Sequence, residues 1–307
     1  MMTISKTTYK GIPALECETN SIRLKFLPEN GCRLQSIVDK QSDKEFLALD
    51  PDHFFKPQFL GGSYVEGDVS GCDDMFPTID PMTFDEGERK GIEYPCHGEV
   101  CRVAHKVEIS EDGFSTFYHS QSLNYDYKKT ITEGENGGVK ISYEITNTGS
   151  DDFRCMWAAH FMAAAEKGGY AVTPFEDGDK GEIMFDEDGQ YGKRNDVFAV
   201  PKAALCSGEY SKSANAYKFF YLDKLSEGKV GYFVPSVGKA VTLRFDKEKL
   251  PYIGVWVNNG RFKEMYNIAM EIATSPFDKP ETAIERGIDF KIPAGQSFKF
   301  DITVTVE

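Results

Sequence analysis

The chain has 307 residues, 40% of them hydrophobic, and a formal net charge of −14. A negative field of this size repels nucleic acids and anionic membranes, so the sequence predicts neither as a partner. No linker or shift in composition divides the chain, and large β-sandwiches reach this length, so we predict a single domain over residues 1–307.

The amino terminus and the cysteines favour a cytoplasmic location. The first residues lead into polar sequence without the apolar segment of a signal peptide. No stretch approaches the roughly 20 apolar residues needed to span a bilayer. The 7 cysteines are scattered and form no CxxC pair, which fits reduced thiols better than a disulfide framework or a zinc site. We therefore expect no metal.

The dominant pattern along the chain is an alternation of apolar and polar residues. It is typical of strands with one buried face, and it occurs in residues 22–26, 123–127, 139–145, 241–245 and 298–306. Hairpin turns are predicted at Asp112-Gly113, at Asn136-Gly137 and at residues 147–149 and 293–295. Residues 161–167 form the best helical candidate, and the polar residues 176–195 are interpreted as a surface excursion.

Strands therefore follow strands, without the alternation of strand and helix that parallel sheets require. This order predicts an all-β protein, a large antiparallel β-sandwich with its sheets packed face to face. The common phosphate-binding, dinucleotide-binding, zinc-protease and serine-hydrolase motifs are absent from the sequence.

Three ionisable residues stand out by their surroundings. His97 lies two residues after Pro95 and directly before Gly98 in a constrained loop, where functional residues are common. His160 lies in an apolar run, and Glu271 lies in an apolar strand, where a carboxylate is costly unless it is paired. Each residue also has an ordinary structural explanation. A histidine can be a hydrogen-bonded residue of the core, and Glu271 can face solvent at the edge of a sheet. Trp157 and Trp256 could stack on a sugar or pack in the core.

In order along the chain, these segments resemble the aldose 1-epimerase superfamily. The resemblance is carried by residues 27–31 and 34–37, Met75-Phe76-Pro77, residues 97–102 (HGEVCR), residues 157–161, Glu271 with Thr274 and Pro276, and residues 293–296. It implies a galactose mutarotase-like supersandwich with a sugar cleft across one sheet. It also implies two histidines and one glutamate in that cleft.

The resemblance assigns roles to individual residues. Glu271 would be the base at the C1 hydroxyl and His160 the acid at the ring oxygen, with His97 binding a hydroxyl. Arg102 would bind a hydroxyl or a phosphate, and Asp74 and Trp256 would line the cleft. The expected reaction is interconversion of the α and β anomers of a small-molecule sugar, without a cofactor.

Two other functions stay open. One is a hexose-6-phosphate 1-epimerase, for which Arg102 with Arg89, Lys90 or Arg261 would supply the basic pocket. The other is a non-catalytic carbohydrate-binding protein on the same fold. The sequence is compatible with a monomer or a homodimer.

Overall fold

The computed structural model describes residues 2–206 and 214–307, and two antiparallel sheets make up most of it. The larger sheet has 12 strands. In spatial order they are β1 (Thr3–Tyr9), β2 (Ile12–Glu18), β3 (Ile22–Leu27), β4 (Arg33–Asp39), β6 (Cys72–Met75), β14 (Ala158–Ala164), β22 (Tyr266–Ala273), β21 (Tyr252–Asn259), β18 (Asn215–Tyr221), β16 (Lys180–Asp186) and β17 (Val197–Ala199), and β5 (Lys44–Glu45) pairs with β4.

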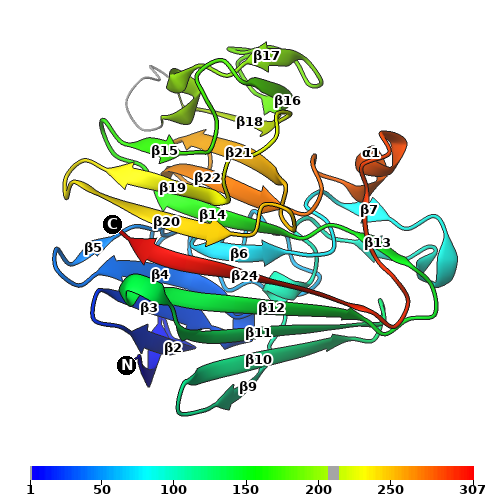
Figure 1. The fold of residues 1–307 in the computed structure, drawn as a ribbon, viewed down its shortest axis with the longest axis horizontal. Coiled ribbons are helices and arrows are strands. Elements are labelled where there is room, and N and C mark those ends of the chain that lie inside the picture. The colour runs from blue at the N-terminus through cyan, green and yellow to red at the C-terminus, as the bar shows by residue number, and fades with distance from the viewer. Residues whose placement is uncertain (1, 207–213) are drawn as a thin grey trace.

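The second sheet has 8 strands. Their order is β15 (Tyr170–Val172), β19 (Lys229–Val234), β20 (Lys239–Phe245), β24 (Ser297–Val306), β12 (Val139–Asn147), β11 (Tyr125–Glu133), β10 (Gly113–Ser120) and β9 (Lys106–Ile109). Figure 1 shows the long strand β24 crossing the middle of the molecule, with β12, β11 and β10 below it.

The remaining elements are short. Two small sheets pair β13 (Phe153–Cys155) with β23 (Phe290–Ile292), and β7 (Met82–Thr83) with β8 (Glu93–Tyr94). The helix α1 covers Pro280–Glu285, and 3-10 turns cover Pro28–Asn30, Gly87–Arg89, Val100–Arg102, Glu135–Gly137 and Lys202–Leu205. Within the described residues, no helix has the length and apolar character needed to cross a membrane.

The core lies between the two large sheets. Trp157, just before β14, packs against Tyr143 of β12 and Phe300 of β24, with ring centroids 5.0 and 4.6 Å apart. Its indole N–H donates to the hydroxyl of Tyr127 at 2.8 Å. The predicted all-β sandwich is confirmed, and Trp157 belongs to its core.

Burial along the strands explains why some were easier to predict than others. In β12, buried and half-buried residues alternate, because one face packs on the larger sheet and the other faces solvent. In β22 every residue after Tyr266 is buried, because its second face is covered as well. Strands of this second kind read as continuous apolar runs.

Two local predictions were wrong for that reason. Residues 161–167 do not form a helix, since β14 covers Ala158–Ala164 and is buried on both faces. Residues 176–195 are not wholly a surface excursion, because β16 lies among them and pairs with β18.

The predicted turns had mixed outcomes. Asp112-Gly113 joins β9 to β10, and Asn136-Gly137 joins β11 to β12, as expected of hairpins. Residues 147–149 and 293–295 do not close hairpins. They lead into and out of the small β13–β23 sheet, so the strands on either side of each turn have other partners.

Candidate active site

A cavity of about 370 Å³ opens over the larger sheet, on the face turned away from the core. This volume lies in the range of ~300–1,000 Å³ that is usual for small-molecule sites. Side chains of β14, β22, β21, β18 and β16, together with the loops around β6, form its lining. The lining comprises Tyr64, Val65, Val69, Ile79, Asp80, Cys96, His97, His160, Met162, Met184, Phe185, Arg194, Lys218, Trp256, Asn258, Phe262, Lys263, Met265, Asn267, Glu271 and Asp278.

His160 and Glu271 lie on the floor of this cavity, and Asp73 contacts His160 from the neighbouring strand without being part of the lining. Asp73 of β6 pairs with His160 of β14, and Glu271 of β22 pairs with Gly254 of β21. Because β14 and β22 are neighbours, His160 Nε2 lies 3.7 Å from Glu271 Oε1. A Cβ at Gly254 would lie 3.2 Å from Glu271 Oε2 and 2.9 Å from the ring of Phe220, so the position favours glycine.

Asp73 lies between the two predicted histidines, and the sequence analysis missed it. Its Oδ2 is 3.1 Å from His97 Nδ1, and its Oδ1 is 3.5 Å from His160 Nδ1. The hydroxyl of Tyr64 donates to the same carboxylate at 3.2 Å. Burial alone would raise the pKa of Asp73, but the two imidazoles and Arg33 hold this pKa well below its usual range. Asp73 is therefore an ionised carboxylate that faces both rings.

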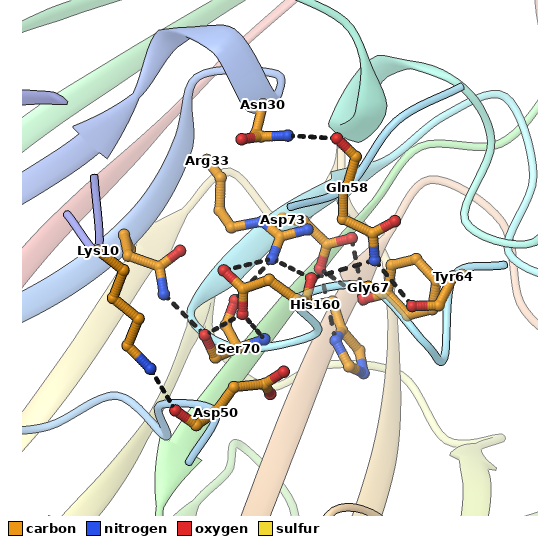
Figure 2. A network of polar contacts seen from close by, with 12 residues as sticks. Lys10, Asn30, Arg33, Asp50, Gln58, Tyr64, Gly67, Ser70, Asp73 and His160 are labelled. Atoms are coloured by element: carbon orange, nitrogen blue, oxygen red, sulfur yellow. Dashed lines mark hydrogen bonds and ion pairs between the residues drawn. The ribbon is translucent and has the colours of Figure 1, made fainter. Parts of the chain in front are cut away.

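A polar network anchors the wall next to these residues (Figure 2). The buried guanidinium of Arg33 donates to the carbonyl oxygens of Asp68 at 2.5 Å and Ser70 at 3.1 Å, and it lies 3.5 Å from the Asp68 carboxylate. The amide of Gln58 donates to the carbonyl oxygens of Tyr64 and Asp68 at 2.8 and 3.1 Å. The segment from Gln58 to Ser70 is thereby fixed against β4.

His97 is held in an unusual backbone conformation. Its φ of 61° lies in the left-handed region, which is uncommon for residues other than glycine. Its amide donates to the carbonyl of Ile79 at 2.6 Å, and its ring stacks on Tyr64 with centroids 3.7 Å apart. Burial lowers the pKa of His97 to about 4, although Asp73 opposes this effect. The neutral ring donates from Nδ1 to Asp73, which leaves Nε2 as a hydrogen-bond acceptor.

Lys218 and Asp278 surround the other side of Glu271. Lys218 Nζ lies 2.6 Å from Glu271 Oε2 and 2.7 Å from Asp278 Oδ1. Burial raises the pKa of Glu271, with Lys218 and His160 acting in the opposite direction. Burial disfavours the charge of Lys218, but the two carboxylates outweigh it and raise the pKa of Lys218. The lysine thus remains a cation that occupies Oε2, while Oε1 faces His160.

Lys218 could have been found from the sequence, whereas Asp73 could not have been told apart from its neighbour. Lys218 lies in the apolar strand NAYKFFY, which is the same signal that singled out Glu271. For Asp73 the signal was ambiguous, because the neighbouring Asp74 is also acidic and only one of two successive strand residues can face the cavity.

The structure contradicts the prediction that Asp74 lines the cleft. It does not line the cavity, because alternation along β6 points it into the sandwich. There its carboxylate forms an ion pair with Lys129 at 2.9 Å and accepts a hydrogen bond from Tyr143 at 3.2 Å. Its role is structural rather than one of lining the cleft.

Arg102 also lies outside the cavity lining. Its guanidinium donates to the carbonyl oxygens of Gly62, at 2.7 Å, and Cys96, and it stands over the ring of Tyr64. Through these contacts Arg102 stabilises the wall of the cavity, and its guanidinium is not placed to bind a sugar directly. The structure places His97, His160, Glu271 and Trp256 in the lining, and their roles there stay predictions.

Asp73, His97 and His160 are also the described residues that could hold a metal ion, since each offers a donor atom and these atoms lie within 4.8 Å of one another. The 3.1 Å separation of Asp73 Oδ2 and His97 Nδ1 is at the same time an ordinary hydrogen-bond distance. A shared proton therefore accounts for this contact as well as a metal would.

Comparison with known proteins places the fold. No protein-family model and no curated protein matches the chain. A protein of Synechocystis superposes with a TM-score of 0.69 at 13% identity, covering 99% of this chain and 96% of its own. A candidate aldose 1-epimerase from Klebsiella pneumoniae gives 0.68 at 14% identity, covering 99% and 83%. A galactose mutarotase-like protein from Clostridium acetobutylicum gives 0.65 at 11% identity, covering 100% and 98%.

The chain therefore has the galactose mutarotase-like β-sandwich fold, as the sequence resemblance implied. At these identities the likeness concerns the fold, and an activity has to be argued from the residues of the cavity.

Proposed function

We propose that the chain is a cofactor-independent aldose 1-epimerase acting on a sugar without a phosphate group. The observation that carries the proposal is the pair formed by His160 Nε2 and Glu271 Oε1, which lie 3.7 Å apart in one cavity. Anomer exchange needs one group at the C1 hydroxyl oxygen and another at the ring oxygen, and both oxygens are bonded to C1. A close acid–base pair suits this geometry.

The forward half of the reaction opens the ring. Glu271 Oε1 takes the proton of the C1 hydroxyl while protonated His160 gives a proton from Nε2 to the ring oxygen. The bond between C1 and the ring oxygen breaks, and C1 becomes an aldehyde carbon. Asp73 and Glu271 flank His160 at 3.5 and 3.7 Å, so the imidazolium has a carboxylate on each side.

The second half closes the ring on the opposite face. After rotation about the C1–C2 bond, the C5 hydroxyl attacks C1 and returns its proton to His160. Glu271 gives its proton back to the former carbonyl oxygen. His97 accepts a hydrogen bond from a sugar hydroxyl at Nε2 throughout. Each proton transfer of this kind contributes about 10²–10⁴-fold.

The pairing of two of the three cations in the cavity favours an uncharged substrate. Three cations and three carboxylates line it, and they are Arg194, Lys218 and Lys263, and Asp80, Glu271 and Asp278. Lys218 is bound to two of these carboxylates, and Lys263 lies 2.5 Å from Asp50. The residues expected to bind a phosphate, Arg89, Lys90, Arg102 and Arg261, are not in the lining.

The test is magnetisation-exchange NMR on neutral aldoses and hexose 6-phosphates with wild type and Glu271→Gln. We expect exchange of a neutral sugar to fall by about 10²–10⁴-fold in the variant. Glu182→Gln is the matched control, because Glu182 is also buried but pairs with Arg286, and neither residue lines the cavity. Exchange limited to a hexose 6-phosphate would favour the phosphate alternative. Sugar binding without exchange in the wild type would favour a binding protein.

A further inference from the structure

Three aromatic side chains form one wall of the cavity, beyond the residues of the proposed chemistry. Trp256 lies against Phe185 on one side and Phe262 on the other, with ring centroids 5.9 and 5.4 Å apart. Phe185 is 39% exposed and Phe262 is 37% exposed, although both are large apolar side chains. We refer to Phe185, Trp256 and Phe262 as the aromatic platform.

The platform stands next to Glu271 on the same face of the sheet. Glu271 pairs with Gly254, and Trp256 pairs with Ala269. The second pair lies two residues further along the same two strands, and therefore on the same face of the sheet. Diagonal neighbours of this kind lie roughly 7–8 Å apart. Gly254 and Ala269 fill the intervening positions, so no bulky side chain on these strands separates the platform from Glu271.

The position of Phe262 is fixed by a buried polar contact. Asn258 accepts hydrogen bonds from the amides of Arg261 and Phe262, both at 3.0 Å, and donates to the carbonyl of Phe262 at 3.0 Å. Asn258 itself is 2% exposed. These hydrogen bonds fix the backbone of the turn that carries Phe262, so the ring of Phe262 is held at the cavity.

We propose that the aromatic platform is a second sugar subsite, and that the substrate is a reducing disaccharide or oligosaccharide. This inference rests on the proposed function. The reducing ring would lie at His160 and Glu271, and the next ring would place its apolar C–H face on the platform. Aromatic side chains combine a large apolar surface with a fixed geometry, which suits such a ring.

The reaction itself restricts how a larger substrate can be built. Anomer exchange requires a free C1 hydroxyl, so a glycoside with an apolar group attached at C1 cannot react. The group that reaches the platform must leave the reducing ring through another of its hydroxyls. A second sugar ring attached in this way has the apolar face that the platform complements and the hydroxyls that keep the substrate soluble.

The test compares cellobiose, maltose and lactose with glucose and galactose, using kcat/KM from magnetisation exchange. We expect at least one disaccharide to exceed the monosaccharides by about tenfold, and this ratio to fall about tenfold in Phe262→Ala. Phe117→Ala is the control, because Phe117 has a similar exposure, 39%, but lies on β10 of the other sheet. In this variant the ratio of disaccharide to monosaccharide kcat/KM should stay at the wild-type value. A wild-type ratio of one or less, or an unchanged ratio in Phe262→Ala, would overturn the subsite.

Equilibrium binding separates this inference from the proposed function. Calorimetry of cellobiose and of glucose is run with wild type and Phe262→Ala. If no sugar exchanges anomers but cellobiose binds about tenfold more tightly than glucose, and only with Phe262 present, the epimerase proposal fails and the subsite stands. If both sugars bind equally in both proteins, the subsite fails whatever the catalytic result.

Discussion

Lys218 Nζ contacts Glu271 Oε2 at 2.6 Å, so one oxygen of the proposed base is already occupied by a buried cation. The other oxygen, Oε1, is the one that faces His160. This contact lowers the pKa of Glu271 in a place where burial raises it. A base that is protonated before substrate arrives cannot take a proton, so Lys218 extends the range in which Glu271 can work to lower pH.

The variant Lys218→Met should therefore shift the pH dependence of anomer exchange. Lys218 lowers the pKa of Glu271, so its loss raises this pKa and moves the acidic limb of kcat/KM to higher pH. Breaking a buried ion pair should also lower the free energy of unfolding by about 3–5 kcal/mol. Lys239→Met is the control, because Lys239 pairs with Asp39 outside the cavity. An acidic limb that stays in place would contradict the assigned role.

Asp73→Asn should lower kcat for anomer exchange by about 10²-fold, because it releases the rings of His97 and His160 from their common partner. It should also lower stability at neutral pH. The pKa of Asp73 is depressed in the folded protein, so its contribution is complete above the ordinary value of 3.8 and is lost as pH falls through the folded value. The gap in unfolding free energy between wild type and variant should therefore narrow in acid. If the difference in unfolding free energy between wild type and Asp73→Asn stayed constant from pH 7 to pH 3, the depressed pKa of Asp73 would be contradicted.

His97 should make the protein less stable in mild acid. The pKa of His97 is lowered to about 4, so between pH 6.5 and 4 the unfolded chain binds one proton that the folded chain does not. Stability then falls with falling pH, by about 1.4 kcal/mol per pH unit for each such histidine. Burial also lowers the pKa of His105, to about 3, so two groups contribute over this range.

Denaturant unfolding between pH 7 and 4 tests this contribution. His97→Gln should reduce the slope of stability against pH by about 1.4 kcal/mol per unit. Equal slopes in wild type and His97→Gln would show that His97 is charged in the folded protein.

Removal of metal ions should leave anomer exchange unchanged. The proposed reaction uses only proton transfer by Glu271 and His160, and the Nδ1 atom of His97 already has a hydrogen-bond partner in Asp73. Exchange rates are measured before and after dialysis against a chelator. A loss of rate that Zn²⁺ or Mn²⁺ restores would show instead that Asp73, His97 and His160 bind a functional ion.

The sequence predicted the two-sheet architecture because strands such as β3, β11 and β12 have one buried face and one wetter face. In β12 the alternation is complete, and it places the strand without further information. It failed for β14, which is covered on both faces and therefore has no polar positions to reveal its period. Helix and strand cannot be told apart in such a run by hydrophobicity alone.

Site residues could be predicted where a charged residue interrupts an apolar strand. They could not be predicted where the register of a strand decides which of two adjacent residues faces the cavity. Glu271 was identified in the first way, and Lys218 carries the same signal. Asp73 and Asp74 are adjacent acids, and one residue of register exchanges the cavity face for the core face. Arg102 was misplaced for a different reason, because its partners are carbonyl oxygens, which leave no trace in the sequence.

The network around Arg33 has a consequence for the speed of binding. Because Arg33 and Gln58 already hold the segment from Gln58 to Ser70, a sugar entering the cavity does not have to order this wall. The conformational entropy of that segment was lost when the chain folded, so little of it opposes association. We expect no slow ordering of this wall before the sugar ring opens, so this wall should not slow association.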